Sequence, residues 1–437
     1  MKIGVVGTGY VGLVSGAGFA DFGNDVVCAD SDRERIDALR RGEVPFFEPG
    51  LPELIQRNVR EGRLRFTAEA AEAAAASEVV FVAVGTPSGP DGGADLRSVD
   101  AAAEAIARGA RGPLVVALKS TVPVGTCDRV AEILARTAPG VAFAVASNPE
   151  FLKEGDAVND FSKPDRVVIG TADARARQLL RDLYAPFMRV ADRVVIMDAR
   201  SAELCKYACN AMLAARVSFM NELAGLCERV GADVEQVRAG MARDPRIGAK
   251  FLFPGAGMGG SCLPKDLRAL AAIGRAAGAP LEIVEATTRV NERQKTLLFD
   301  KIHAHFKGDL RGRRIAIWGL AFKPRTDDVR EAPALEIVRR LLDAGASVRA
   351  HDPQAMAQAR RVLGDRIEYA ESAYAAVDGA DALCVVTEWP EFRRPDFGRI
   401  RAAMRAPVLF DGRNLWEPDA MRALGFVVYG IGRPSPP

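Results

Sequence analysis

The sequence predicts an α/β protein: two Rossmann-like, doubly wound α/β domains joined by a helical middle segment with one long helix. Three observations carry this prediction. Short β-rich runs alternate with helical segments in the first part of the chain and again in the last part, a pattern typical of parallel sheets covered by helices. The stretch between them is helical, and the 437 residues exceed what one hydrophobic core usually organises. We expect three domains, over residues 1–198, 199–306 and 307–437.

The first thirty residues form the expected start of the N-terminal sheet. Residues 2–6 are a short β-rich run, residues 11–22 have the apolar spacing of a helix, and residues 25–30 form a second strand. Strands and Ala-rich helices then alternate, with strands expected at 79–84, 114–118, 141–146 and 166–169 and helices at 98–110 and 127–138. All of these strands are expected to run parallel in one sheet.

The middle segment is dominated by one helix. Residues 201–223 contain neither Gly nor Pro, so we expect a single long helix that continues towards residue 230. This helix is the expected interface of a homodimer. Shorter helices are expected at 234–242, 267–277 and 281–301.

The C-terminal part repeats the α/β pattern after a polar, glycine-containing break at residues 307–312. Strands are expected at 314–318, 347–351 and 382–386, and a helix at 334–344. Residues 433–437 are expected to form an untethered tail.

Composition and charge argue against several classes of protein. The 59 basic and 57 acidic residues give a net charge of +2, which argues against a protein that binds nucleic acid or a membrane surface. No stretch of about 18 uncharged apolar residues is present, so no transmembrane helix is expected. The apolar N-terminus contains glycines that fit a strand–turn–helix better than a signal peptide.

Cysteine and histidine usage narrows the chemistry. The seven cysteines form no C-x-x-C pair, so neither a disulfide framework nor a metal site is expected, and the reducing cytoplasm is the expected location. The only histidines are His303, His305 and His351, without an H-E-x-x-H motif. An enzyme with this sequence is therefore expected to work through carboxylates, lysines, threonine or a thiolate.

A glycine motif lies between the first strand and the first helix. Residues 7–12 match G-x-G-x-x-G, in which the glycines permit a tight turn, a close approach of pyrophosphate, and close helix packing. Asp30 ends the second strand, where a carboxylate accepts from a ribose hydroxyl and repels a 2′-phosphate. The motif therefore predicts NAD rather than NADP, although Arg33 and Arg35 keep that preference from being absolute. The alternative is an α/β turn that binds no nucleotide.

Cys262 is the candidate nucleophile. It follows two glycines and precedes Pro264, which suits the first position of a helix. A thiolate is stabilised just before a helix N-terminus and beside Lys265, and Asp266 could hold a water or a lysine near the sulfur. The alternative is a small buried cysteine, which we expect for three others, Cys28, Cys205 and Cys209.

Several polar residues accompany this cysteine. Lys206 and Asn210 are four residues apart on the long helix, so they share a face on which an oxyanion could be stabilised; the alternative is a solvated helix face. Lysines are few, and several stand in motif-like settings: Lys119, Lys206, Lys265 and Lys323. Other candidates follow predicted strands, namely Thr121, Glu150 and Glu154, and the C-terminal part offers Lys323, Arg330 and Arg413 to phosphates.

An NAD site with a poised thiolate, and without a catalytic histidine, favours oxidation of an alcohol to an acid. A first hydride leaves to give an aldehyde, the thiolate adds, and the thiohemiacetal carbon gives up a second hydride. Water then cleaves the thioester. Lys206 is expected to stabilise the alkoxide and each tetrahedral oxyanion.

A larger set of segments carries a family resemblance: residues 7–12 with Tyr10-Val11, 45–50, 85–87, 119–123, 148–155, 246–248, 251–255, 259–266, and Phe322-Lys323 with Arg330. Over essentially its whole length, the chain resembles the UDP-glucose/GDP-mannose dehydrogenase superfamily. The resemblance implies an NAD-binding domain over 1–198, a central helical domain with the dimer interface over 199–306, and a UDP-sugar-binding domain over 307–437. One departure is Met258, where the family usually places an aromatic residue, and it leaves the shape of the sugar pocket open.

The resemblance also implies roles for individual residues. The catalytic residues would be Cys262 as the nucleophile, with Lys206, Asn210, Asp266, Thr121 and Glu150. NAD would be contacted by Gly7, Gly9, Tyr10, Val11, Gly12, Asp30, Arg35, Thr86, Thr121, Glu154, Lys265 and Arg330. The sugar nucleotide would be held by Glu150, Phe151, Leu152, Lys153, Glu154, Lys206, Asn210, Phe251, Leu252, Phe253, Pro254, Gly255, Gly259, Lys323 and Arg413. Arg246 resembles an arginine that the family extends across the dimer.

The activity implied by the resemblance is oxidation of UDP-glucose to UDP-glucuronate with two NAD per turnover. The nearest alternative is the same chemistry on GDP-mannose or a UDP-N-acetylhexosamine; the spacing between residues 246–248 and 251–252 looks more like the UDP-glucose branch. Two alternatives come from other classes. One is a nucleotide-binding regulator without turnover, and the other is a one-step hydroxyacid dehydrogenase related by fold alone.

Overall fold

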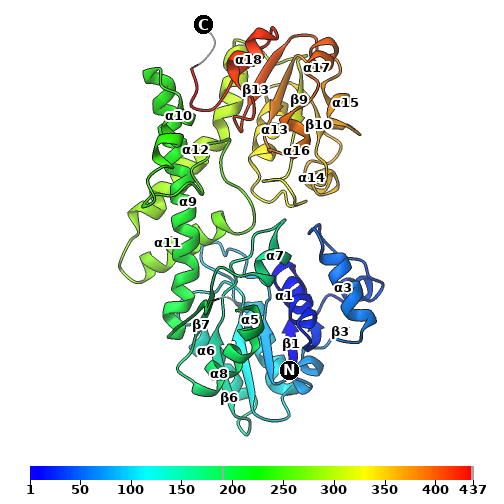
Figure 1. The fold of residues 1–437 in the computed structure, drawn as a ribbon, viewed down its shortest axis with the longest axis vertical. Coiled ribbons are helices and arrows are strands. Elements are labelled where there is room, and N and C mark those ends of the chain that lie inside the picture. Colours follow the sequence, from blue (N-terminus) through cyan, green and yellow to red (C-terminus); the bar gives the residue numbers. More distant parts are fainter. Residues whose placement is uncertain (189–190, 435–437) are drawn as a thin grey trace. The chain divides into compact units, whose positions relative to one another are not determined.

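The computed structural model describes residues 1–188 and 191–434, and it divides into two compact units. Unit 1 comprises Met1–Cys209 and Arg268–Ala279, and unit 2 comprises Asn210–Leu267 and the chain from Pro280 onward. Two helices, α9 (Ala199–Val230) and α11 (Leu263–Ala276), contribute residues to both units (Figure 1). The predicted division into three domains stays a prediction.

Unit 1 is built on an eight-stranded sheet of order β3-β2-β1-β4-β5-β6-β7-β8. The strands are β1 (Lys2–Val6), β2 (Asp25–Ala29), β3 (Leu64–Thr67), β4 (Val79–Val82), β5 (Leu114–Leu118), β6 (Phe143–Ser147), β7 (Val167–Gly170) and β8 (Val194–Met197). The first six run parallel in the order of a dinucleotide-binding sheet. The prediction of a doubly wound α/β domain is confirmed for this part.

The predicted parallel direction is wrong between β6 and β7. These two strands pair antiparallel through Ser147 and Gly170, and β8 then runs parallel to β7. The helix between β6 and β7, α7 (Ala157–Ser162), has six residues and is about 9 Å long. It is shorter than the five-residue strand β6, which is about 17 Å long, so it does not carry the chain back to the far end of the sheet.

Helices cover both faces of the unit 1 sheet because alternate residues of each strand point to opposite sides. On one face, Val5 and Phe81 pack with apolar residues of α1, α2, α3, α7 and α8. On the other face, Val6 and Val82 pack with α4, α5 and α6. The helices are α1 (Tyr10–Asp21), α2 (Arg33–Arg40), α3 (Leu51–Arg60), α4 (Ala70–Ala75), α5 (Arg97–Gly109), α6 (Thr126–Thr137) and α8 (Ala174–Tyr184), with a 3-10 turn at Ala185–Phe187.

Unit 2 contains a six-stranded parallel sheet of order β11-β10-β9-β12-β13-β14, the same order as the first six strands of unit 1. Its strands are β9 (Arg314–Trp318), β10 (Ser347–His351), β11 (Glu368–Tyr369), β12 (Ala382–Val385), β13 (Val408–Asp411) and β14 (Val427–Tyr429). Its helices are α10 (Val234–Met241), α12 (Glu282–His305), α13 (Pro333–Asp343), α14 (Met356–Leu363), α15 (Ala373–Val377), α16 (Pro390–Arg393), α17 (Phe397–Ala403) and α18 (Pro418–Ala423). The second predicted α/β domain is therefore confirmed.

The same glycine turn follows the first strand of each sheet. Gly7 has a φ of 101° and Gly319 a φ of 93°, a region that favours glycine. A Cβ at Gly7 would lie 2.5 Å from the carbonyl oxygen of Ala83, and one at Gly319 would lie 2.4 Å from the Cβ of Thr387. Both turns therefore require glycine for space as well as for conformation.

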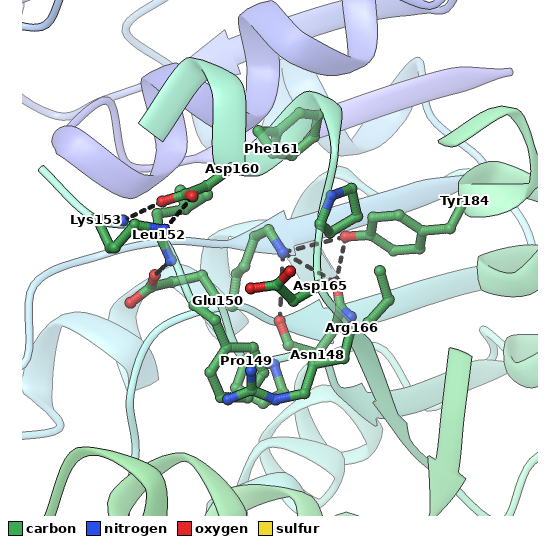
Figure 2. Close-up of a pocket in the computed structure, with 14 residues that line it drawn as sticks. Asn148, Pro149, Glu150, Leu152, Lys153, Asp160, Phe161, Asp165, Arg166 and Tyr184 are labelled. Atoms are coloured by element: carbon green, nitrogen blue, oxygen red, sulfur yellow. Dashed lines mark hydrogen bonds and ion pairs between the residues drawn. The ribbon is translucent and has the colours of Figure 1, made fainter. Parts of the chain in front are cut away.

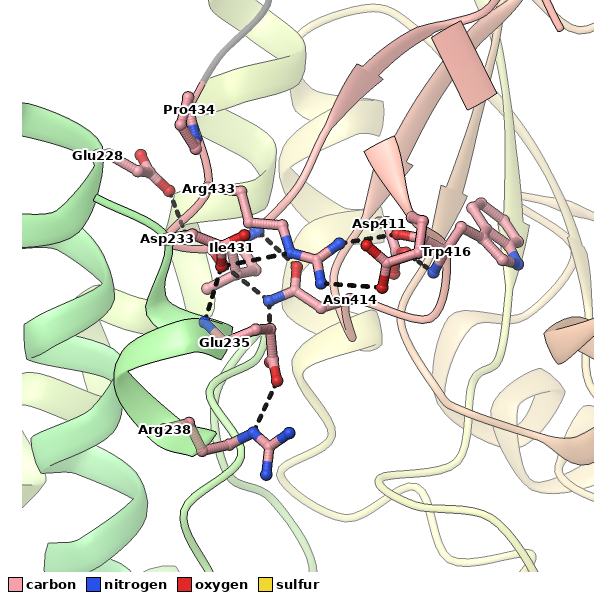
Figure 3. Close-up of polar contacts among 12 residues, drawn as sticks. Glu228, Asp233, Glu235, Arg238, Asp411, Asn414, Trp416, Ile431, Arg433 and Pro434 are labelled. Atoms are coloured by element: carbon pink, nitrogen blue, oxygen red, sulfur yellow. Dashed lines mark hydrogen bonds and ion pairs between the residues drawn. The ribbon is translucent and has the colours of Figure 1, made fainter. Parts of the chain in front are cut away.

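The C-terminal segment is anchored up to Arg433, so the predicted untethered tail is wrong there (Figure 3). Arg433 is 4% exposed and donates through Nη1 to the Trp416 carbonyl at 2.8 Å. The amide of Asn414 accepts from Ile431 N at 2.9 Å and donates to Ile431 O at 2.8 Å. The N–H of Gly432 donates to Glu228 of α9 at 2.7 Å. These partners come from distant parts of the chain; residues 435–437 lie outside the described residues.

Among residues 1–188 and 191–434, none of the helices combines the length and apolar character needed to cross a membrane.

Candidate active site

The turn between β1 and α1 leaves room for a ligand at one glycine. A Cβ at Gly12 would lie 1.8 Å from the Gly7 carbonyl oxygen, so this position is closed to any side chain. A Cβ at Gly9 would meet no atom within 4 Å. Gly9 lies at the N-terminus of α1, where backbone N–H groups attract a pyrophosphate. The adjoining cleft has a volume of about 570 Å³ and is lined by Gly7, Gly9, Asp30 and Arg35 among others.

Asp30 is held at the end of β2 by a dense set of hydrogen bonds. Its Oδ2 accepts from Thr8 N at 2.7 Å and from Thr8 Oγ1 at 2.9 Å, and Arg35 Nη1 lies 3.1 Å away. Burial raises the pKa of Asp30, but hydrogen bonds from Thr8 and Asp32 and the charge of Arg35 outweigh it and bring the pKa below its ordinary value. The carboxylate is therefore ionised, as a ribose acceptor must be.

The two arginines near Asp30 are both paired with carboxylates. Arg35 lies 3.1 Å from Asp30 and 3.4 Å from Asp32, and Arg33 lies 3.1 Å from Glu69. A 2′-phosphate would have to compete with these acidic partners. The geometry therefore fits NAD better than NADP.

The second sheet carries an aspartate in the corresponding place, but its oxygens are fully used. Asp352 follows β10, as Asp30 follows β2, and it is 1% exposed. It accepts hydrogen bonds from Leu320 N (2.7 Å), Ala321 N (3.0 Å), Gln354 N (2.9 Å), Ala355 N (2.8 Å) and Trp389 Nε1 (3.0 Å). No oxygen of Asp352 is left for a ribose hydroxyl. The two Rossmann-like turns therefore differ in the hydrogen-bonding capacity that their aspartates leave to a ligand.

A buried carboxylate ties the first helix to the loop after β6. Glu48 is 2% exposed and accepts from Gly155 N at 2.6 Å, from Ala157 N at 2.8 Å and from the hydroxyl of Tyr10. Burial and the neighbouring Glu48 raise the pKa of Tyr10 above its ordinary value. No role for Glu48 was predicted from the sequence. The one feature of the sequence that could have indicated a role for Glu48 is its place as an acidic residue directly after two phenylalanines in residues 45–50.

The carboxyl ends of β4 and β5 are linked in the same region. Thr86 Oγ1 donates to the carbonyl of Thr121 at 2.8 Å, and Thr86 is buried. The predicted cofactor residues Tyr10, Val11 and Glu154 are half-buried. Gly7, Gly9, Gly12, Asp30, Arg35, Thr86 and Thr121 belong to the same unit. Unit 1 thus holds most of the residues predicted to contact NAD.

A small cavity of about 60 Å³ lies beside the ends of β5 and β6 (Figure 2). The Nζ of Lys119 lies 3.1 Å from both Asn148 Oδ1 and the Tyr184 hydroxyl, and that hydroxyl donates to Asn148 Oδ1 at 2.7 Å. Burial lowers the pKa of Lys119 to about 8. Lys119 was singled out in the sequence as one of few lysines and within residues 119–123, but its contact with Tyr184 was not predictable, because Tyr184 lies far along the chain.

Glu150 and Lys206 form a buried ion pair at one wall of this region. Lys206 Nζ lies 3.0 Å from Glu150 Oε1, with side chains 5% and 6% exposed. Glu150 Oε2 also accepts from Leu152 N at 2.5 Å. The ring of Phe151 lies 5.3 Å from Lys206 Nζ and 3.7 Å from the Arg166 guanidinium. The alternative of a solvated helix face is therefore wrong for Lys206, and also for Asn210, which is 7% exposed.

In unit 2, Cys262 is exposed at the start of α11. Asp266 N donates to the Cys262 carbonyl at 2.9 Å, which makes Cys262 the residue that caps the helix. The helix begins at Leu263, so Pro264 occupies its second position rather than the predicted first. Ser261 Oγ lies 3.5 Å from the Cys262 sulfur.

Asp266 forms a cluster with two other predicted residues, Lys265 and Asn210. It is 1% exposed, and its Oδ1 lies 2.6 Å from Lys265 Nζ. Its Oδ2 accepts from Asn210 Nδ2 at 2.6 Å. Asp266 thus contacts a lysine, while its predicted place near the Cys262 sulfur stays a prediction. Asn210 is brought to Asp266 from a helix more than fifty residues earlier.

The predicted substrate segment is a tightly held loop in unit 2. Phe251 has a φ of 61°, uncommon for a bulky residue. Leu252 and Pro254 are buried, whereas Phe253 is 59% exposed and lies 4.6 Å from the Arg238 guanidinium. A Cβ at Gly255 would lie 2.8 Å from Arg413 Nη1. The structure therefore brings Arg413 against this loop.

The remaining predicted residues contact side chains or backbone groups that were not themselves predicted to belong to the site. A Cβ at Gly259 would lie 2.5 Å from the Glu331 carbonyl oxygen. Lys323 Nζ lies 5.4 Å from the Phe322 ring. Arg330 and Arg246 are exposed and pair with Asp328 at 2.7 Å and Asp244 at 2.6 Å. Lys153, exposed in unit 1, pairs with Asp160, and Leu152 is half-buried.

The predicted small buried cysteines divide into two groups. Cys28 is buried as predicted, but Cys205 and Cys209 are half-buried. Both lie on α9, and Arg166 Nη2 donates to Cys209 Sγ at 3.4 Å. The prediction is wrong for these two because the helix face that carries them is only partly covered.

Known proteins resemble the chain over its whole length. Residues 1–188, 200–293 and 316–418 match the NAD binding domain, the central domain and the UDP binding domain of the UDP-glucose/GDP-mannose dehydrogenase family. The UDP-glucose 6-dehydrogenase of Pseudomonas aeruginosa is 53% identical, with 99% of this chain and 98% of that protein covered.

Two solved structures are also similar. A UDP-glucose dehydrogenase from Pyrobaculum islandicum has a TM-score of 0.92 and 42% identity, with 99% of this chain and 98% of that one covered. A UDP-D-ManNAc dehydrogenase from Pyrococcus horikoshii has a TM-score of 0.86 and 29% identity, with 99% of each chain covered.

Proposed function

Because this chain belongs to the UDP-glucose/GDP-mannose dehydrogenase family, we propose that it oxidises UDP-glucose to UDP-glucuronate with two NAD per turnover. It is an NAD-dependent dehydrogenase of that family. The proposal rests on Cys262, an exposed thiol at the start of α11, together with Asp266, which is buried and contacts Asn210 and Lys265. Relatives named UDP-glucose dehydrogenase support UDP-glucose as the substrate.

NAD supplies a hydride acceptor for each of two oxidation steps. We assign its pyrophosphate to the open backbone at Gly9, beside Gly7 and Gly12, and its adenosine ribose to Asp30. Further contacts are assigned to Tyr10, Val11, Arg35, Thr86, Thr121, Glu154, Lys265 and Arg330. The ionised state of Asp30 and the open space at Gly9 support this assignment.

Cys262 is the proposed nucleophile. After the C6 alcohol of the glucosyl group has lost one hydride and its hydroxyl proton, the thiolate adds to the aldehyde carbon, and the oxygen takes a proton to give a thiohemiacetal. Loss of the second hydride and that proton leaves a thioester on the cysteine. Water then adds to the thioester carbonyl, and the sulfur leaves as the carboxylic acid forms. The solvent exposure of Cys262 supports its access to substrate.

Charge that develops during these steps needs fixed partners. We assign the stabilisation of the alkoxide and of each tetrahedral oxyanion to Lys206, with Asn210 assisting. Asp266 is assigned the attacking water, and Glu150 and Thr121 assist. The burial of Lys206 and Asp266 supports these roles, because charges are most effective where bulk water is excluded.

The residues assigned to the sugar nucleotide are Glu150, Phe151, Leu152, Lys153, Glu154, Lys206, Asn210, Phe251, Leu252, Phe253, Pro254, Gly255, Gly259, Lys323 and Arg413. A UDP binding domain in the matched family supports the C-terminal contacts. The closed Asp352 turn also supports them, because it leaves that domain unsuited to an NAD ribose.

We also propose a cytoplasmic homodimer. In unit 2, α9 exposes Met212, Phe219 and Leu226 at seven-residue intervals, with side chains 64%, 52% and 54% exposed. Residues seven apart lie along the same stripe of a helix, so this exposed apolar stripe supports a second copy of the chain as the occupant, with Arg246 proposed to reach towards it. The seven cysteines form no C-x-x-C motif, which supports a reducing compartment.

The experiment that tests the function is NADH stoichiometry. Wild-type protein is expected to form two NADH per UDP-glucose, whereas Cys262→Ser should stall severely. GDP-mannose and the UDP-N-acetylhexosamines are assayed beside UDP-glucose, and activity confined to one of them would overturn the substrate assignment. One NADH per substrate, with full activity in Cys262→Ser, would indicate a one-step dehydrogenase. Absence of turnover with every sugar nucleotide would favour a regulator.

A further inference from the structure

The loop that leads to Cys262 has no regular secondary structure of its own. Residues 252–262 lie in neither a helix nor a strand. The loop includes Gly257 with a φ of 113° and Gly260 with a φ of 86°. Buried backbone groups must nevertheless find hydrogen-bond partners. Met258 and Gly260 are buried, so their partners come from other elements of unit 2.

One face of α12 supplies many of these partners. Asn291, Gln294 and Lys295 stand at positions i, i+3 and i+4 and therefore share a helix face. Their exposed fractions are 3%, 7% and 6%. Three polar side chains buried side by side on a helix are uncommon unless each is hydrogen-bonded. All three point to the loop or to the segment that supports it.

Asn291 holds the backbone of Met258 from both sides. Its Oδ1 accepts from Met258 N at 2.7 Å, and its Nδ2 donates to Met258 O at 3.1 Å. This side-chain amide thus satisfies both polar groups of a residue four positions before Cys262. A two-point contact fixes the orientation of the peptide as well as its position.

Gln294 holds the loop at Gly255, three residues before Met258. Its Nε2 donates to the Gly255 carbonyl at 2.7 Å, while Gly255 N donates to Asn221 Oδ1 of α9 at 2.8 Å. Gly255 belongs to the segment assigned to the sugar nucleotide. Gln294 therefore acts on the substrate segment, whereas Asn291 acts closer to the cysteine.

Lys295 acts on the segment that supports the last part of the loop. Its Nζ lies 3.1 Å from Glu331 Oε2 and 3.0 Å from Glu292 Oε1. Glu331 has a φ of 54°, and the carbonyl of its neighbour Arg330 accepts from Gly260 N at 2.8 Å. Lys295 thus stabilises an unusual backbone conformation that anchors Gly260, two residues before Cys262.

We propose that Asn291 and Gln294 of α12 are positioning residues, Asn291 for the nucleophile Cys262 and Gln294 for the sugar-nucleotide segment at Gly255. This inference deepens the proposed function and rests on it for the identity of the nucleophile. The two side chains act only through the loop. Misplacement of a reacting group by about 1 Å costs roughly 100-fold in rate, so the effect is large even though neither residue is assigned a contact with substrate.

The test compares variants of the full-length protein. Asn291→Ala is expected to lower kcat for NADH formation roughly 10- to 100-fold with little change in the KM for UDP-glucose. Gln294→Met is expected to raise the KM for UDP-glucose more than it lowers kcat. Thr287→Val on the same helix is the matched control. It removes a part-buried hydrogen bond of 2.8 Å to Ile283 O, a bond within the helix itself, so its kinetics should match those of the wild type.

The conservative variant Asn291→Asp separates positioning from general damage. The aspartate keeps an oxygen that accepts from Met258 N, but it places a second carboxylate oxygen next to Met258 O, where the asparagine amide donated a hydrogen bond. Its kcat relative to the wild type should therefore rise as the pH falls, because the protonated carboxyl can donate to that carbonyl. A ratio that stays flat with pH would overturn the two-point contact.

A readout without substrate keeps this inference separate from the proposed function. Alkylation of Cys262 by iodoacetamide, followed by peptide mass spectrometry, is expected to change at least about threefold in Asn291→Ala and to stay unchanged in Thr287→Val. Unaltered alkylation together with unaltered kcat in Asn291→Ala would overturn the positioning role. If the wild type oxidises no sugar nucleotide, the proposed function fails while the alkylation result still decides the role of Asn291.

Discussion

Lys206 Nζ lies 3.0 Å from Glu150 Oε1, and both side chains are more than nine-tenths buried. Lys206 comes from the long helix α9, and Glu150 comes from the loop after β6. The pair places a fixed positive charge at the carboxyl end of the unit 1 sheet, where ligands of such sheets bind. Removal of either charge alone takes from the other its buried ion-pair partner, which is costly away from water.

The first prediction concerns this pair. Lys206→Ala is expected to lower kcat for NADH formation by roughly two to three orders of magnitude and the free energy of unfolding by about 3–5 kcal/mol. The double variant Lys206→Met with Glu150→Gln removes both charges, so it should recover stability but not activity. Urea unfolding and steady-state kinetics measure the two effects. Recovery of activity in the double variant would contradict a catalytic role for Lys206.

The second prediction separates two glycines of the nucleotide turn. Gly9→Ala meets no atom within 4 Å, so the folded protein should keep its Tm while NAD binding, measured by calorimetry, weakens roughly tenfold or more. Gly12→Ala places a Cβ 1.8 Å from the Gly7 carbonyl oxygen, so Tm itself should fall. Unchanged NAD affinity in Gly9→Ala would show that pyrophosphate does not approach this glycine.

The third prediction is a pH dependence from Lys119. Burial lowers the pKa of Lys119 from 10.5 to about 8, so between these pH values the unfolded chain binds more protons than the folded one. The stability of the wild type should therefore rise with pH relative to Lys119→Met, by up to about 3 kcal/mol. Urea unfolding at pH 7 and pH 9.5 covers part of this range and should show a rise of about 2 kcal/mol. Lys163→Met, at an exposed position, is the control. Its free energy of unfolding should differ from that of the wild type by the same amount at both pH values.

The fourth prediction concerns the buried end of the chain. Arg433→Met removes the hydrogen bond to Trp416 O of 2.8 Å and should lower the free energy of unfolding by about 2–4 kcal/mol. Burial raises the pKa of nearby Asp411 to about 6, while Arg433 lowers it. The loss should therefore be larger at pH 8, where that carboxyl is charged, than at pH 5. Arg422→Met, whose partner Asp419 is 97% exposed, should change stability by less than about 0.5 kcal/mol; an equal loss there would contradict the anchoring role of Arg433.

The sequence alone determined the features that a few neighbouring residues encode. Strands β1, β5, β9 and β10 lie where apolar, β-rich runs predicted them, and the long helix α9 follows from a stretch without Gly or Pro. The glycine turn with Asp30, and Cys262 at the start of a helix, were also readable, because turns and helix starts depend on local backbone chemistry.

The tertiary structure decided what depends on partners far along the chain. It placed β7 antiparallel to β6, buried Arg433 among distant carbonyls and carboxylates, and closed Asp352 with five donors while Asp30 still faces a cleft. It also aligned Asn291 with Met258 across 33 residues. Periodicity along a chain reports which face of an element is buried, but it does not report which polar group meets which, because that is settled only when separate elements pack together.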